Sequence, residues 1–209
     1  VRVNETRFTE EDLLPSPEEK RARLQSIVER VATMTGVLAG GLYIGGLIAL
    51  GACAAPAVFR LTPSPYSGDA MCVAFARFDQ IAIGASVVAL ASEIGRTWAG
   101  GLSGRTRLAR IRRMSAIFMA FAATYVGLAL SPRINELHRS GVRRDETPQG
   151  QMLESIHKRA ESTGKAGLFF AVAFVGLNIF TLRVRRPDEE DEDDVGEVFA
   201  PLPPGPRDD

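Results

Sequence analysis

The sequence has few of the side chains that catalytic and metal sites commonly need. Its 209 residues include two cysteines, Cys53 and Cys72, and two histidines, His138 and His157. Two cysteines are too few for a disulfide scaffold. The sequence also lacks a phosphate-binding loop, a nucleophile elbow, an HExxH motif and a CxxC pair. We therefore expect a protein that is not an enzyme, with no catalytic residue and no cofactor.

Charge is missing from four stretches of the chain and is crowded into the segments between them. The charge-free stretches are residues 31–59, 81–92, 114–132 and 166–182. The average composition, 45% hydrophobic and 24% charged, would fit a soluble domain. Four apolar islands are instead typical of a polytopic membrane protein. The predicted fold is all-α, a bundle of four transmembrane helices with long helical extensions.

The predicted organisation has three parts. Residues 1–32 are expected to form a polar cytoplasmic segment with an amphipathic helix, and residues 33–184 the transmembrane domain. Residues 185–209 are expected to be a disordered tail, because they are rich in acidic residues and proline. The four spans are expected at about 33–55, 79–99, 114–131 and 165–183.

Local signals place two helix starts and one helix end. Glu19 closes a capping box with Ser16, an N-cap residue that precedes Pro17 at the first helical position. Thr147 and Pro148 repeat this pattern, so we expect the fourth helix to begin outside the membrane and run inward without a break. Pro56 is expected to end or kink the first helix at the outer interface.

The distribution of Lys and Arg predicts the orientation. The N-terminal segment and the segment between the second and third spans each carry six, three follow the fourth span, and the first outer loop carries two at most. By the positive-inside rule, both termini then lie in the cytoplasm, with the protein in a bacterial inner membrane. The segment between the third and fourth spans carries seven, which argues against this orientation.

The basic sequence RTRLARIRR, at residues 105–113, would fit a nucleic-acid-binding surface in a soluble protein. Beside membrane spans, retention on the cytoplasmic side and contact with anionic lipid explain it more simply. We therefore expect the lipid bilayer as a partner, together with other membrane subunits or further copies of this chain, and no nucleic acid.

Charged residues flank or enter the second span. Only 13 residues between Asp79 and Glu93 are free of charge, which is about 20 Å of helix. The favoured interpretation places Arg77, Asp79, Glu93 and Arg96 at the two interfaces with local ion pairs. The alternative has Glu93 or Asp79 facing the bundle interior as an ion or proton site. Asn178 is expected to hydrogen-bond a neighbouring helix.

Glycines in the first span have the spacing of close helix packing. Gly36 with Gly40, and Gly41 with Gly45, each form a small-xxx-small pair that would let another helix approach.

All cysteines and histidines fall near the outer face of the predicted topology. Cys53, Cys72, His138 and His157 together would suit copper or zinc, and histidine a haem iron. Their spacing in the sequence is not diagnostic. We favour no metal site there, and a Cys53–Cys72 disulfide remains an alternative.

Three segments carry a family resemblance: GLYIGGLIALGACAAPAVFRL, SGDAMCVAFARFD and YVGLALSPRINEL. They resemble four-helix membrane proteins grouped as a bacterial domain of unknown function, with eukaryotic relatives called transmembrane-protein-205-like. The matching positions are Pro56, Phe59, Gly68, Phe75, Pro132, Arg133 and Ile134. The resemblance covers roughly residues 36–182 and implies a four-helix membrane architecture with no assigned activity.

These features predict a structural or interaction component of a membrane assembly, without catalysis of its own. The alternative is a small transporter or ion-conducting protein, or one that handles copper or haem. The last possibility rests on a distant resemblance of the glycine-rich first helix to membrane proteins that handle those groups.

Overall fold

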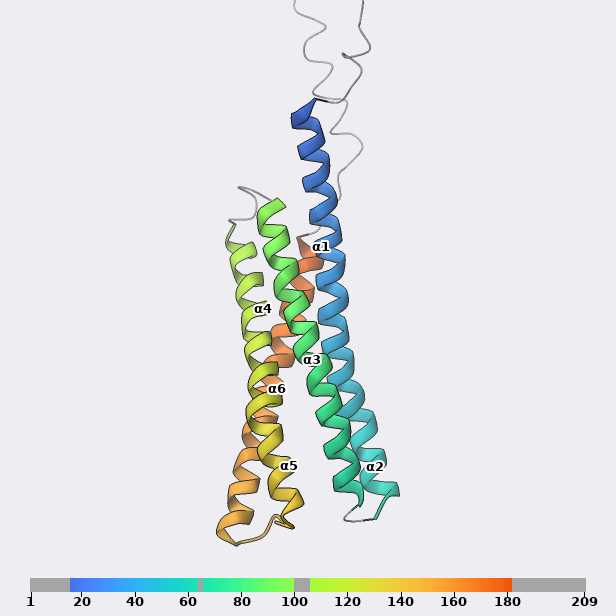
Figure 1. Cartoon of the computed structure of the whole chain (residues 1–209), viewed down its shortest axis with the longest axis vertical. Helices are drawn as coiled ribbons and strands as arrows, with labels where there is room; N and C mark the ends of the chain where they lie inside the picture. The colour runs from blue at the N-terminus through green and yellow to red at the C-terminus, as the bar shows by residue number, and fades with distance from the viewer. Residues whose placement is uncertain (1–15, 64–65, 100–105, 182–209) are drawn as a thin grey trace, which may run out of the picture.

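The computed structural model describes residues 16–63, 66–99 and 106–181. The predicted tail at 185–209 and the first part of the predicted N-terminal segment lie outside these residues. The described residues form four helical rods (Figure 1). The rods are, in order, α1 (Pro17–Ile48) with η2 (Ala49–Ala54) and α2 (Ala55–Leu61); α3 (Tyr66–Ala99); α4 (Arg107–Tyr125) with η4 (Val126–Leu130) and α5 (Ser131–Arg139); and α6 (Pro148–Phe180).

The rods run antiparallel and close into a bundle. The α1 rod packs against α3 and α6, and α4 packs against the same two helices. In Figure 1, α2 and α5 lie at one end of the bundle, here called the hairpin end, and α1 begins at the other, the Pro17 end. All four rods are long and apolar enough to cross a membrane. The predicted all-α bundle of four membrane helices is confirmed.

The helix starts follow from local side-chain caps. The Ser16 hydroxyl accepts a hydrogen bond from the Glu19 backbone N–H, while the Glu19 carboxylate accepts one from the Ser16 backbone, so the predicted capping box is confirmed. The Thr147 hydroxyl accepts from Gly150 N–H, which confirms the predicted start of α6. Thr106 caps α4 in the same way.

The helices extend well beyond the predicted spans. α3 begins at Tyr66, whereas the second span is expected from 79, and the third rod runs from Arg107 to Arg139, beyond both ends of the span expected at 114–131. A charge-free run marks the part of a helix that suits hydrocarbon. It does not mark where the backbone hydrogen bonds end, because polar residues continue a helix outside the lipid.

Each π-helical segment is followed two residues later by a proline. Just before Pro56, the Ala55 N–H donates to the carbonyl of Leu50, five residues earlier. Just before Pro132, the Ser131 N–H donates to the carbonyl of Val126, again five residues earlier. A proline ring clashes with the carbonyl four residues earlier, and a widened turn moves that carbonyl away. The helix therefore passes through Pro56 to Leu61. Of the two alternatives expected at this proline, an end of the helix is wrong, and a kink stays a prediction.

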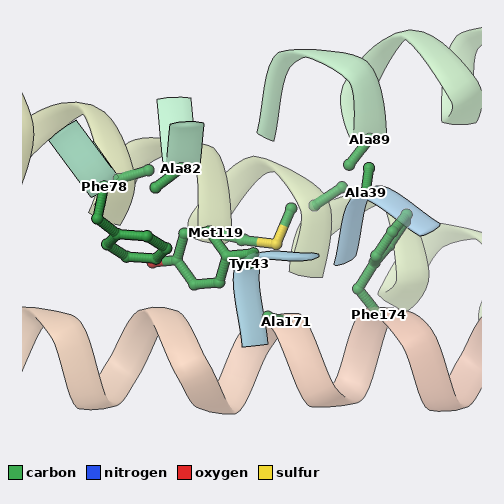
Figure 2. Close-up of a cluster of buried hydrophobic side chains, with 10 residues drawn as sticks. Ala39, Tyr43, Phe78, Ala82, Ala89, Met119, Ala171 and Phe174 are labelled. Carbon is green, nitrogen blue, oxygen red and sulfur yellow. The ribbon is translucent and has the colours of Figure 1, made fainter. Parts of the chain in front are cut away.

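Small side chains fill the interior, and large apolar ones face outward. The main core cluster draws six alanines from the four long helices, with Tyr43, Phe78, Met119 and Phe174 between them. Figure 2 shows Phe78 beside Tyr43 at one end of this cluster and Phe174 at the other. Leu38 and Phe121 are more than half exposed. Because lipid is as apolar as leucine, such a bundle is held by close packing of small residues.

The two predicted glycine pairs of α1 face different surroundings. A Cβ added at Gly40 would lie 2.5 Å from Val175 Cγ2 and 3.2 Å from Phe174 Cδ1, and Gly36 meets Ser92 and Phe174. Gly41 and Gly45 have no atom within 4 Å of an added Cβ, so among the described residues only the first pair packs against other helices. Gly46, which the sequence analysis did not single out, packs against the Phe78 ring.

Replacing Gly40 by Ala is expected to lower the free energy of unfolding by about 1–3 kcal/mol, because the added methyl overpacks a closed contact. The adjacent Gly41→Ala is the matched control and should be neutral or slightly stabilising, since Ala favours helix. Thermal unfolding in detergent micelles would compare them. Equal stability of the two variants would contradict the packing described here.

Candidate functional site

The buried face of α3 carries charge at its Pro17-end half. Glu93 is 1% and Arg96 5% exposed. They share a face with Ala82, Ser86 and Ala89 because these positions alternate at spacings of three and four residues. Both side chains therefore face the bundle interior, and neither lies at its outer surface.

Glu93 pairs with Arg112 of α4. Arg112 Nε donates to Glu93 Oε1 at 2.6 Å, and the two side chains are 5% and 2% exposed. The sequence had suggested a local pair between Glu93 and Arg96, three residues apart. The structure instead joins two helices across the bundle.

Arg96 and Arg112 extend the network to the other two helices. Arg96 donates to Asn178 Oδ1 of α6 at 2.5 Å, and its guanidinium lies 3.8 Å from Glu29 Oε1 of α1. Thr181, directly after α6, accepts from Arg112 at 2.8 Å and from Arg96 at 3.4 Å. We call this set the charged cluster: Glu29, Glu93, Arg96, Arg112, Asn178 and Thr181.

The charged cluster can form inside an apolar bundle because its charges largely offset one another. Two guanidinium groups face the buried Glu93 and the half-exposed Glu29. Burying an unpaired charge would be costly, and pairing with several hydrogen bonds lowers that cost. Glu93 Oε2 and Arg96 Nε make no hydrogen bond within the described residues. The charges are thus paired, while these two atoms can still form hydrogen bonds.

Sequence reasoning found only half of the charged cluster. Glu93, Arg96 and Asn178 were singled out, and the expected bond from Asn178 to a neighbouring helix is confirmed. Arg112 was read only as a flanking charge. Its helical spacing to Ser115 and Met119, which are also buried, is the signal that would have placed it inside.

The other two charged residues predicted near the second span, Arg77 and Asp79, lie away from the charged cluster. Arg77 is exposed on the outer surface of α3. Asp79, two residues later, is 9% exposed and faces the interior. It lies 14 residues before Glu93, or about 21 Å along the helix.

The histidines lie together at the hairpin end. The rings of His138 in α5 and His157 in α6 have centroids 5.8 Å apart in a T-shaped arrangement. His157 lies in the charged first half of α6, before the apolar stretch. Burial, aided by Arg144 and His138, lowers the pKa of His157 to about 4, so its ring is neutral at pH 7.

The cysteines do not join the histidines in a metal-binding group. Cys53 and Cys72 are both free thiols, so the alternative of a disulfide between them is not formed. In residues 16–63, 66–99 and 106–181 there is no group of three His, Cys, Asp or Glu side chains that could hold a metal ion.

Residues of the resemblance gather at the hairpin end. Most of them are exposed, but Gly68 is half-buried and Ile134 of α5 is buried; they lie in α2, in the first part of α3 and in α5. They are Pro56, Phe59, Gly68, Phe75, Pro132, Arg133 and Ile134.

Residues 38–143 match the family described as a domain of unknown function (DUF4149). The chain belongs to the DUF4149 family. The match to a family of unknown function agrees with the resemblance found in the sequence, over a shorter range. No curated protein and no solved structure matches the chain. The matched region contains Glu93, Arg96 and Arg112 but not Glu29, Asn178 or Thr181, so the charged cluster extends beyond it on both sides.

Glu93→Gln is expected to lower the free energy of unfolding by about 3–5 kcal/mol, the usual cost of breaking a buried ion pair from one side. Loss of the Glu93 charge would also leave the guanidinium groups of Arg96 and Arg112 facing one another. The double variant Glu93→Leu with Arg112→Met should be far less destabilised than the two single losses together, because no buried charge of the pair is left behind.

Denaturation in micelles would measure these differences. Glu161→Gln is the control, because its ion pair with Lys165 is exposed and should contribute little. A Glu93→Gln variant as stable as the wild type would show that the pair does not hold α3 to α4.

Proposed function

We propose that this DUF4149 protein is an integral membrane protein without catalytic activity, which acts as a structural or interaction component of a membrane assembly. The Glu93–Arg112 pair carries the proposal. Its charges are used within the chain, where they join α3 to α4, and the neighbouring Arg96 is held by Asn178 and Glu29. Charges committed to helix–helix contacts favour a rigid scaffold over a site that exchanges ligands.

The outward face of α1 supports an interaction role. Gly41, Gly45 and Ala49 are exposed at four-residue spacing, with nothing near an added Cβ at either glycine. Leu38 and Leu42, both more than half exposed, lie beside them. In lipid, small residues at this spacing let a second helix approach closely, and flanking leucines supply the dispersion contacts. We propose that a transmembrane helix of another membrane subunit, or of a second copy, packs here.

Gly41→Leu with Gly45→Leu tests this proposal. The leucines would block the approach of a second helix without touching the rest of this chain. Protein extracted from native membrane in lipid nanodiscs would be weighed by native mass spectrometry. We expect a stable complex for the wild type and its loss in the double variant. Gly84→Leu is the control, since that exposed glycine of α3 also has open space around it.

A wild-type protein that is monomeric and free of other polypeptides in nanodiscs would overturn the interaction role. A complex that survives both leucines would place the interface elsewhere on the bundle.

We propose further that the protein lies in a bacterial inner membrane with both termini cytoplasmic, and that its family is related to the transmembrane-protein-205-like proteins. The Lys and Arg residues of the N-terminal segment, of the segment between the second and third spans and of the segment after the fourth span support this orientation, whereas the seven between the third and fourth spans oppose it. The hairpin end would then face outward, and the Pro17 end, with the charged cluster, would lie nearer the cytoplasm.

Thiol labelling tests the orientation. In a background with Cys53 and Cys72 replaced by Ala, Arg143→Cys should react with a membrane-impermeant maleimide in intact cells. Ser16→Cys should react only after the membrane is opened. The reverse pattern would invert the topology.

A further inference from the structure

Asp79 is a buried carboxylate without the partner that Glu93 has. It is 9% exposed, and its Oδ2 has no hydrogen-bond partner in the described part of the chain. Among those residues no Lys, Arg or His forms an ion pair with it, whereas Glu93 has Arg112. An isolated carboxylate inside an apolar bundle is costly, and such residues at membrane depth commonly mark ion or proton sites.

The third rod faces this carboxylate with a glycine and a serine, Gly127 and Ser131. A Cβ added at Gly127 would lie 3.1 Å from Asp79 Cβ, so glycine is what lets the two helices meet there. The Ser131 side chain lies within hydrogen-bonding reach of the Asp79 carboxyl group. Tyr43 of α1 and its neighbour Phe78 border the same region.

The backbone of the third rod beside Asp79 loses one helical hydrogen bond at a proline. Ser131 N–H bonds to Val126 O in the π-helical register. Pro132 has no N–H, so the carbonyl that residue 132 would otherwise bond, that of Gly127 or Leu128, receives no hydrogen bond from it. Helix carbonyls point toward the following turn, which here holds Ser131. Broken or widened helices supply ion-coordinating carbonyls in this way.

We infer that Asp79, the Ser131 hydroxyl and the carbonyl oxygen that Pro132 leaves without a partner, at Gly127 or Leu128, form a binding site for a monovalent cation, with Na⁺ as its ligand. Carboxylate, hydroxyl and carbonyl oxygens are hard donors that suit such an ion. One carboxylate balances one positive charge, which favours a monovalent over a divalent ion. The site is independent of the interaction role proposed above, because it lies inside the bundle and not on the outer face of α1.

Thermal unfolding of the purified full chain in detergent would test the site. NaCl would be titrated against choline chloride at constant ionic strength, at pH 7.5. We expect the wild-type midpoint to rise with Na⁺ and to saturate, because an ion that binds only the folded state stabilises it. Asp79→Asn should lose this dependence. Ser131→Ala should keep it with a several-fold higher half-saturating Na⁺ concentration.

Asp69→Asn is the matched control, since that aspartate is exposed on the same helix and should respond to Na⁺ like the wild type. Binding of radioactive ²²Na⁺ to the wild type, measured by equilibrium dialysis, tests the site even if Asp79→Asn does not fold. A midpoint that changes with pH but not with Na⁺ would mean that the carboxylate carries only a proton, and would overturn the inference. An equal Na⁺ response in Asp79→Asn would overturn it too.

Discussion

The arrangement of the four helices depends on how they bury charged side chains in a membrane interior without water. Hydrophobic burial does little to hold membrane helices together, because lipid already solvates their apolar faces. The Glu93–Arg112 pair and the bonds from Arg96 to Asn178 and Glu29 supply specific contacts between helices that lipid cannot replace. Because these contacts involve all four rods, they fix which faces of the helices point inward.

The close packing of the helices follows from which of their faces point inward. The same face of α3 that presents Glu93 presents Ala82, Ser86 and Ala89, so α3 can approach its neighbours along most of its length. Gly36 and Gly40 do the same for α1 by accommodating Phe174 of α6. The large side chains are thereby turned outward, where lipid solvates them.

The sequence predicts the rods well because the long gaps between charges depend only on the solvent around each segment. It predicts the helix starts at Ser16 and Thr147 because a cap is a local interaction. Two features depend instead on tertiary packing: which glycine pair of α1 faces inward, and that Arg112 does. Gly40 and Gly41 differ by one position, or about 100° around the helix, and only the neighbours decide which one faces inward.

The inward position of Arg112 was missed for a related reason. Basic residues beside a membrane span are commonly exposed, so counting charges assigns Arg112 to the flank. Its helical register with Ser115 and Met119 opposes that assignment, and the register proves the better guide because a helix continues unchanged across the interface. The helix continuing through Pro56 is a further case, since the five-residue hydrogen bond that accommodates the proline leaves no mark in the sequence.

The two buried carboxylates of α3 show that one helix face can serve two purposes. Glu93 lies opposite Arg112 of the third rod, and their ion pair joins α3 to α4 near the Pro17 end of the bundle. Asp79 lies opposite the same rod where it presents Gly127 and Ser131, which carry oxygen atoms but no positive charge. The difference lies in the third rod, which presents a permanent cation at one level and only uncharged oxygen donors at the other. The ion pair near the Pro17 end can therefore keep the helices in place while Asp79, nearer the hairpin end, binds and releases a cation.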